Sequence, residues 1–285
     1  IPWNQQGILM LRFEPGDQAT WEKLMEARRS QGWKLQLWDR EKVQTYCPQV
    51  MNSRVVGAVY SPQDRQIDPV ALTQALVAAA QQRGVQFRFD AAIEQWFATP
   101  DQPHPYCVQL AGAAVAADWI VIAAGLGSTG LTSMAQKPIN IQPVLGQAMR
   151  VKLPAPLGDA HFQPVISGED VHIVPLGQGE YWVGATVEFP TVTGEVKVNA
   201  DRLQEVWQGA IALCPELAAA EIVTTWSGLR PRPSDRPAPV IEPLPEYPHV
   251  LVATGHYRNG ILLAPATALA VRETIGGQST DFYPR

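Results

Sequence analysis

A β-rich stretch from residue 142 to residue 187 limits how this chain can fold more than any other feature. Its segments PVLGQAMRVKLP, VHIVPLG and GEYWVGATVEF alternate apolar and polar residues, as half-buried antiparallel strands do. Segments at 68–126 and 250–275 flank this stretch, and in both of them apolar strands alternate with helices. This order predicts two domains that exchange segments along the chain, rather than two domains in succession.

Local signals set the expected element boundaries. The pair Asp68-Pro69 predicts a helix start and Gly84 its end. The segment VQFRFDAAIEQWFA is then expected to form a pair of strands, and a hairpin leads into a buried strand from Trp119 to Ala124. The other predicted strands lie at 7–13 and in RVVGAVYSP, EIVTTWSGLRPRPSD and VLVATG. The other predicted helices lie at about 19–29 with Asp17 as cap, at 40–46, from Asp201 as cap to Pro215, and at about 260–273.

Composition excludes several classes of protein. The 285 residues are 46% hydrophobic and 17% charged with a net charge of −5, which predicts a globular protein without a nucleic-acid partner. Cys47, Cys107 and Cys214 are odd in number and far apart, which favours a reducing, cytoplasmic location over a disulfide framework. The histidine spacing predicts no metal site, and no apolar run is long enough to predict a membrane span.

The segment ADWIVIAAGLGSTGL holds Gly125, Gly127 and Gly130 in the spacing of a dinucleotide-binding turn. Such a turn also needs a following helix and an acidic residue about 20 positions on. The next segment, LTSMAQKPINIQPVLGQAMRVK, contains no Asp or Glu, and Pro138 and Pro143 interrupt a long helix. Two interpretations stay open, a phosphate-binding turn and a buried strand that ends in a glycine turn, and the pattern favours the second.

The richest local chemistry lies in HVLVATGHYRNGILLAP, residues 249–265. An apolar strand leads through a polar loop to a helix whose N-terminus offers unpaired N–H groups and a partial positive charge. Such an end stabilises a phosphate, or a ring oxygen that becomes anionic during a reaction. An ordinary strand-loop-helix corner is the alternative.

Arg230 and His172 are the other candidates. Arg230 precedes Pro231, which fixes the chain beyond it, and a fixed guanidinium can hold a carboxylate through two parallel hydrogen bonds. A surface ion pair with Asp235 is the alternative for Arg230. His172 lies on a predicted strand, where a lone histidine is more often structural than catalytic.

Together, GHYRNGILLAPATA, WSGLRP, ADWIVIAAG and YWVGATVE resemble motifs of the flavin-dependent glycine/D-amino acid oxidase family, in particular its bacterial glycine oxidases of thiamine biosynthesis. The resemblance runs from Gly7 to about Val271. It implies an α/β (α+β) fold, in which a Rossmann-like FAD-binding domain that lacks its first βαβ unit is interleaved with an antiparallel β-sheet substrate domain. The substrate domain would comprise residues 1–60 and 136–228, and the FAD-binding domain residues 61–135 and 229–285.

In this family the dinucleotide fingerprint lies about 80 residues ahead of the position where this chain starts. The resemblance therefore implies that the spacing in GLGSTG is accidental. We expect the chain to be a fragment of a longer product or to have lost its front part by cleavage, and a degenerate relative stays open.

The resemblance also implies roles for individual residues. Arg230 would bind the substrate carboxylate, His172 occupies the place of an active-site tyrosine, and Arg258 would gate the pocket. Gly125 would pack close to the flavin, and the backbone of Ile93 would meet the adenine side of the cofactor. The residues implied to line the isoalloxazine ring are His256, Tyr257, Arg258, Asn259, Gly260, Ile261 and Leu262.

The implied activity is that of an FAD-dependent amino acid oxidase. A hydride passes from the α-carbon of glycine or another small amino acid or amine to flavin N5, and water then hydrolyses the resulting imine to an oxo acid and ammonia. Oxygen, the second partner, reoxidises the flavin and gives H2O2. Two other functions stay open: a dehydrogenase of the same fold that uses another electron acceptor, and a non-catalytic binding or assembly protein. A homo-oligomeric state also stays open.

Several positions depart from the family pattern and motivate these alternatives. His172 replaces a tyrosine, and Val187 replaces a methionine that faces the ring. The other departures are Gly127 in place of a tryptophan, Leu176 where a basic residue is common, and Arg232-Pro233 in place of a glycine-bearing turn. They leave the substrate open.

Overall fold

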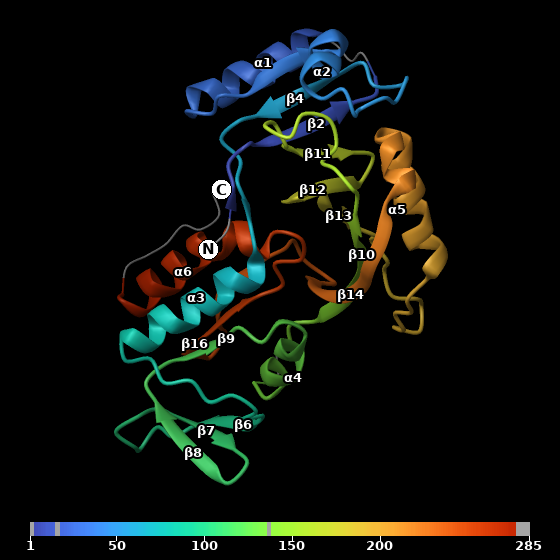
Figure 1. The fold of residues 1–285 in the computed structure, drawn as a ribbon. Coiled ribbons are helices and arrows are strands. Elements are labelled where there is room, and N and C mark those ends of the chain that lie inside the picture. Colours follow the sequence, from blue (N-terminus) through green and yellow to red (C-terminus); the bar gives the residue numbers. More distant parts are fainter. Residues whose placement is uncertain (1–2, 15–17, 136–137, 278–285) are drawn as a thin grey trace. The chain divides into compact units, whose positions relative to one another are not determined.

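The structure is a computed structural model that describes residues 3–14, 18–135 and 138–277 (Figure 1). The chain divides into two compact units, each made of three segments. The first unit comprises Ile1–Ala80, Gly146–Val187 and Lys197–Gly228, and the second comprises Gln81–Leu145, Glu188–Val196 and Leu229–Arg285. Helices and sheets are both abundant, so the predicted α/β (α+β) class is confirmed.

An eight-stranded sheet organises the first unit, with the strand order β14-β10-β13-β12-β11-β2-β4-β3. Its strands are β2 (Ile8–Arg12), β3 (Gln36–Asp39), β4 (Gly57–Ser61), β10 (Ile141–Lys152), β11 (Val165–Gly168), β12 (Val171–Gly177), β13 (Glu180–Gly184) and β14 (Glu221–Pro233). Neighbouring strands from β10 to β11 pair antiparallel as predicted, whereas β11 pairs parallel with β2. Strands β10 and β14 contribute residues to both units. The short strands β1 (Trp3–Asn4) and β5 (Gln66–Ile67) pair separately.

The core on this sheet includes residues of α2 (Arg40–Tyr46), α5 (Ala200–Leu213) and the 3-10 helix η2 (Pro215–Ala219). Helix α1 (Gln18–Ser30) also belongs to the first unit. Figure 1 shows α5 beside β12 and β13, where Trp207 joins the core that contains Val171 and Ile173. Because side chains alternate along β12, His172 and Val174 lie on the opposite face, as the sequence pattern predicts.

The second unit contains two three-stranded sheets, β15-β16-β9 and β6-β7-β8. Its elements are β6 (Ile93–Ala98), β7 (Tyr106–Leu110), β8 (Ala113–Ala117), β9 (Ile120–Ile122), η1 (Gly125–Gly127), α4 (Ser128–Ser133), β15 (Val240–Leu244), β16 (Tyr247–Thr254) and α6 (Gly260–Ile275). Helix α6 packs on β15 and β16. The core of this unit joins Val250 and Val252 of β16 to Ile122, Trp96 and Tyr106.

The predicted start of α3 (Pro69–Gln82) is confirmed. Asp68 Oδ1 accepts hydrogen bonds from the backbone N–H groups of Val70, at 2.8 Å, and Ala71, at 2.9 Å. These bonds satisfy two of the N–H groups that a helix start leaves without an intrahelical partner.

Three sequence predictions need correction. VQFRFDAAIEQWFA forms one strand, β6, since residues 85–90 have no ladder partner in the described ranges. The strand expected at 119–124 shrinks to Ile120–Ile122. The cap of α5 is Asn199, whose Oδ1 accepts from the N–H of Asp201, because the helix begins one residue before that aspartate. The cap predicted at Asp17 lies outside the described residues.

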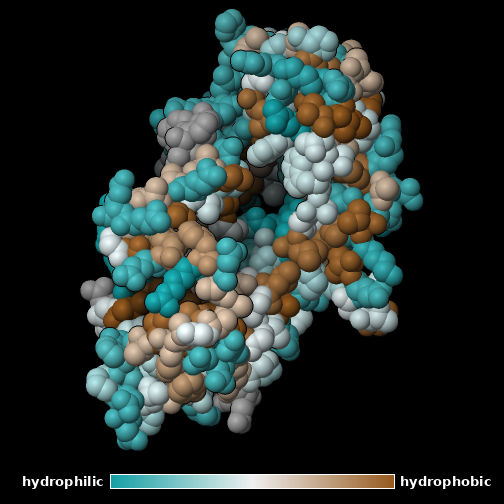
Figure 2. Space-filling model, turned by 60° about the horizontal axis from the view of Figure 1, so that its bottom comes forward, coloured by the Kyte–Doolittle hydropathy of each residue, from teal (hydrophilic) through white to brown (hydrophobic). Residues whose placement is uncertain are grey.

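Apolar side chains reach the surface in separate patches on the face shown in Figure 2. Helix α6 is mostly apolar, yet Ala270 is its one buried residue, and Leu262 is 77% exposed. None of the helices in the described ranges has both the length and the apolar character that crossing a bilayer requires.

Candidate active site

The loop before α6 lies against the end of β14 in the second unit. The backbone N–H of Tyr257 donates a hydrogen bond to the carbonyl of Pro231 over 3.0 Å. Gly255 has a φ of +73°, and a Cβ at this position would lie 2.8 Å from Cγ of Pro233. The close approach therefore requires glycine. Through these contacts the structure brings Arg230 and the predicted loop residues 256–259 into one neighbourhood.

The glycine turn after β9 reaches the same place. Thr254 Oγ1 donates to the carbonyl of Gly125 over 3.2 Å, and Ser128 Oγ donates to Thr254 Oγ1 over 2.9 Å. Gly125 has a φ of +57°, and a Cβ built on it would lie 3.9 Å from Cγ of Pro231. Gly125, Arg230 and the loop at 256–259 are thus three predicted site positions that the fold gathers.

The segment GLGSTG does not have the form of a phosphate-binding turn. The N–H of Gly127 donates to the carbonyl of Ala124 over 3.0 Å, and Gly130 lies inside the short helix α4. The buried hydroxyl of Thr132 donates to the carbonyl of Ser128. Because these groups bond within the turn and helix, the geometry supports the interpretation as a strand that ends in a glycine turn.

Arg230 is half-buried, and its guanidinium Nη1 donates to the carbonyl of Leu145 over 3.3 Å. Burial, and after it the positive charge of Arg258, lower the pKa of Arg230, while Tyr257 opposes the shift. Arginine stays protonated in proteins despite such shifts. A partly desolvated guanidinium near a second positive charge favours an anion beside it.

The first turn of α6 is a second anion-favouring feature. Asn259 is the N-cap residue but makes no side-chain capping hydrogen bond, and its carbonyl accepts from the N–H of Leu263 over 2.9 Å. The first N–H groups of a helix have no intrahelical partner and carry the positive end of the helix dipole. They are therefore available to an acceptor outside the chain.

His256 is held within the same loop. Its Nε2 lies 2.8 Å from Thr267 Oγ1 on α6, and burial lowers its pKa. The imidazole is therefore neutral at pH 7 and adds no charge to the site. The next residue, Tyr257, has a φ of +53°, a conformation that is uncommon for a side chain of this size.

The other predicted site residues lie elsewhere. His172 is in the first unit, on β12, where its Nδ1 lies 2.9 Å from Ser167 Oγ. Ile93 begins β6 in the second unit, pairs with Leu110 and is 43% exposed. Among the described residues, no group of three or more His, Cys, Asp or Glu side chains could hold a metal ion.

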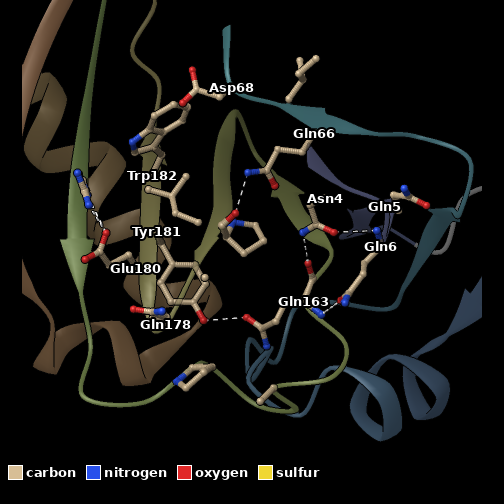
Figure 3. A pocket seen from close by; sticks show the side chains of 18 residues that line it. Asn4, Gln5, Gln6, Gln66, Asp68, Gln163, Gln178, Glu180, Tyr181 and Trp182 are labelled. Atoms are coloured by element: carbon tan, nitrogen blue, oxygen red, sulfur yellow. Dashed lines mark hydrogen bonds and ion pairs between the residues drawn. The ribbon is translucent and has the colours of Figure 1, made fainter. Parts of the chain in front are cut away.

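The first unit also holds an open pocket of about 730 Å³, lined by both apolar and polar side chains, that the sequence did not predict (Figure 3). Gln66 Nε2 donates to the carbonyl of Pro175 over 2.7 Å, and the hydroxyl of Tyr181 donates to Gln163 Oε1 over 2.8 Å. Among the described residues, none forms a hydrogen bond with the buried Oε1 of Gln66. Segments far apart in the sequence supply these side chains, so no local motif could have indicated the pocket.

The rim of this pocket carries an ion pair. Arg150 Nε donates to Glu180 Oε2 over 2.9 Å, and Lys152 Nζ lies 3.4 Å from Glu180 Oε1. The hydrogen bond from Arg150, with a smaller contribution from Lys152, lowers the pKa of Glu180. The ion pair therefore joins the neighbouring strands β10 and β13 at the rim of the pocket.

Known proteins identify the class to which this fold and site belong. The chain matches the family described as FAD dependent oxidoreductase over residues 1–274, and it belongs to that family. The resemblance seen in the sequence is thereby confirmed, and so is FAD as the cofactor of the family.

The relatives narrow the class. The chain is 30% identical to the glycine oxidase of Geobacillus kaustophilus over 235 residues, which are 82% of this chain and 60% of that protein. It is 33% identical to a bifunctional protein ThiO/ThiG of Nostoc sp. over 227 residues, which are 80% of this chain and 33% of that protein. The chain thus spans less than two thirds of either relative.

A solved glycine oxidase structure has the same fold as this chain. The crystal structure of glycine oxidase from Geobacillus kaustophilus superimposes with a TM-score of 0.85 at 27% identity, over 99% of this chain and 74% of that one. The chain therefore has the fold of a glycine oxidase over nearly its whole length.

The site described above fits the ring of FAD. The N1–C2=O edge of isoalloxazine gains negative charge on reduction, and the start of α6 offers N–H groups that no side chain caps. A Cβ on Gly260 would meet His256 Cβ at 3.8 Å as its nearest neighbour, so the backbone there is open to a ligand. Residues 256–262 are therefore a suitable edge for the flavin ring, whereas the turn at Gly125 is not a pyrophosphate cradle.

Proposed function

We propose that the intact protein containing this chain uses FAD to oxidise glycine or another small amino acid to its imine. The observation that carries the proposal is the hydrogen bond from Tyr257 N–H to the Pro231 carbonyl. It ties the strand end bearing Arg230 to the loop that leads into α6. A carboxylate-binding cation and a set of backbone donors for an anionic ring thereby belong to one site.

In this proposal each residue has a physical task. Arg230 binds the substrate carboxylate and orients the α-carbon. The N–H groups at the start of α6 stabilise negative charge on the edge of the ring. Arg258, exposed on the loop, gates access. FAD, when bound, supplies the two-electron acceptor at its N5.

The domain roles follow from these tasks. We assign the second unit to FAD binding and the first unit, with His172 on its sheet, to the substrate side. The name of the glycine oxidase relative supports glycine as the substrate, and the ThiO/ThiG relative supports a place in thiamine biosynthesis. Oxygen as the acceptor, H2O2 as the product and thiazole synthesis as the pathway step are further parts of this proposal. The three cysteines form no disulfide, which is consistent with a cytoplasmic protein.

The test uses the intact protein after purification. It should show the two visible absorption bands of a flavin and produce peroxide with glycine, sarcosine or D-alanine. Turnover with an artificial dye but without oxygen uptake would instead indicate a dehydrogenase. A colourless protein that stays colourless with excess FAD would contradict the proposal and favour a binding or assembly role.

A further inference from the structure

Arg232 is a second cation beside the proposed carboxylate clamp. It lies two residues beyond Arg230 on β14, and side chains two apart on a strand point to the same side, about 6.6 Å from each other along the strand. Pro231, between them, faces the other way. The strand end therefore presents two guanidinium groups in one direction.

Two aromatic rings hold this second cation. Arg232 Cζ lies 5.6 Å from the ring centre of Phe189 and 5.9 Å from the ring centre of Tyr257. Such contacts orient a guanidinium without cancelling its charge, since the rings are neutral. In the described part of the chain Arg232 forms no ion pair with a carboxylate.

The position of Tyr257 links Arg232 to the site. Tyr257 belongs to the loop before α6, and its N–H is bonded to the Pro231 carbonyl. The ring that holds Arg232 is thus part of the loop assigned to the flavin. Arg232 is half-buried, so a bound anion would be partly shielded from water, where a charged hydrogen bond is stronger.

We propose that Arg232 makes this site selective for amino acids that carry a second carboxylate, on the side chain or on the nitrogen. This inference rests on the proposed function, in which Arg230 holds the first carboxylate. The second carboxylate accepts hydrogen bonds from Arg232, whose guanidinium is already oriented by the two rings. Glycine and sarcosine, with one carboxylate, make no use of this cation.

The test compares substrates on the intact, FAD-loaded protein. The value of kcat/KM is measured for glycine, sarcosine, both enantiomers of aspartate, and iminodiacetate. At least one dicarboxylate should exceed glycine by about tenfold, the effect expected of one charge-assisted hydrogen bond. The variant Arg232→Met should lose this advantage and keep its activity with glycine, while Arg232→Lys should keep part of it.

Two further variants separate recognition from packing. Phe189→Leu keeps the charge at position 232 but removes one ring, so the KM for the dicarboxylate should rise severalfold with little change for glycine. Arg236→Met is the matched control, because Arg236 pairs with Glu242 and should leave the preference unchanged. An equal loss for glycine and dicarboxylates in Arg232→Met would show that Arg232 only supports the fold, and would overturn the inference.

The outcomes also distinguish this inference from the function on which it rests. If glycine is oxidised and no dicarboxylate exceeds it, the proposed function stands and the role of Arg232 is wrong. If none of the amino acids reduces the bound flavin, the proposed function itself fails.

Discussion

At the scale of single residues, the proposed carboxylate binding depends on how Arg230 is held. The order arginine-proline in the sequence already predicted a fixed guanidinium. The structure adds what no sequence pattern could indicate, namely the Leu145 carbonyl that Arg230 contacts and the loop bonded to Pro231. These partners come from distant parts of the chain, so their identity depends on the fold.

Replacing Arg230 by lysine tests the geometry of the clamp. Lysine keeps the positive charge but cannot form two parallel hydrogen bonds to one carboxylate. We expect Arg230→Lys to raise the KM of the preferred amino acid about tenfold or more with an unchanged flavin spectrum. Arg272→Lys, on the exposed side of α6, is the control. An unchanged KM in Arg230→Lys would mean that the substrate carboxylate binds elsewhere.

His256 predicts a pH dependence of stability. Its pKa is lowered in the folded state, whereas in the unfolded chain it is close to about 6.5. Above that pH both states are neutral and the full stability is present. As the pH falls below it, the unfolded state takes up the proton first, so the free energy of unfolding decreases until the lowered pKa is reached.

The measurement is urea unfolding between pH 7.5 and pH 5, values that bracket about 6.5. His256→Asn should flatten the part of the curve below neutral pH, and His161→Asn serves as a control for the substitution. An identical slope in the wild type and His256→Asn would show that this histidine is not the titrating group.

At the scale of elements, the sequence was sufficient to predict a helix where the capping residue is adjacent to that helix in the sequence. The helix at 40–46 and the start of α3 were predicted with the observed boundaries, because the caps Asp39 and Asp68 lie in sequence next to their helices. The prediction of two strands in VQFRFDAAIEQWFA was wrong, because a strand is defined by a neighbouring strand that the local pattern does not contain.

The corrected cap of α5 leads to a stability prediction. Asn199 Oδ1 accepts from the N–H of Asp201, so Asn199→Ala should lower the free energy of unfolding by about 1 kcal/mol. Asp201→Ala should lower the free energy of unfolding by only a few tenths of that amount, because the carboxylate then no longer interacts with the helix dipole. Urea unfolding of both variants checks the order, and a larger loss for Asp201→Ala would restore the original prediction.

Gly255 predicts a link between backbone geometry and cofactor binding. A methyl group there would strain the positive φ and meet Pro233 at 2.8 Å, which would push the loop away from β14. We expect Gly255→Ala to weaken FAD binding, measured by flavin fluorescence, beyond any general loss of stability. Gly84→Ala is the control, since Gly84 has a φ of +87° and no neighbour within 4 Å. Equal effects of the two variants would contradict a specific role for the loop.

At the scale of the whole molecule, the interleaved order of segments was visible in the sequence, because β-rich and α/β patterns alternate. The pocket in the first unit and the pairing of β2 with β11 were not visible, since both join residues far apart in the chain. The sequence motifs predicted the protein family, whereas contacts between distant segments decide which residues come together in the site.

The cysteines test the separate cores of the two units. Cys47 and Cys214 are fully buried in the core of the first unit, and burial raises the pKa of Cys47 to about 12. Cys107 lies in the second unit and is partly exposed. We expect a thiol reagent to label Cys107 alone in the native protein, and the other two only as the first unit unfolds. Mass spectrometry of labelled peptides checks this, and rapid native labelling of Cys214 would contradict the described core.

The most direct test of the central claim is anaerobic reduction of the bound flavin by glycine or the preferred amino acid, followed by absorbance in the wild type and in Arg230→Leu. The wild-type flavin should bleach at a rate that saturates with the concentration of amino acid. The variant should keep its flavin spectrum and need a concentration about 100-fold higher, because the carboxylate clamp is gone. Equal half-saturating concentrations for the two proteins would contradict the claim that Arg230 and the loop before α6 form one site.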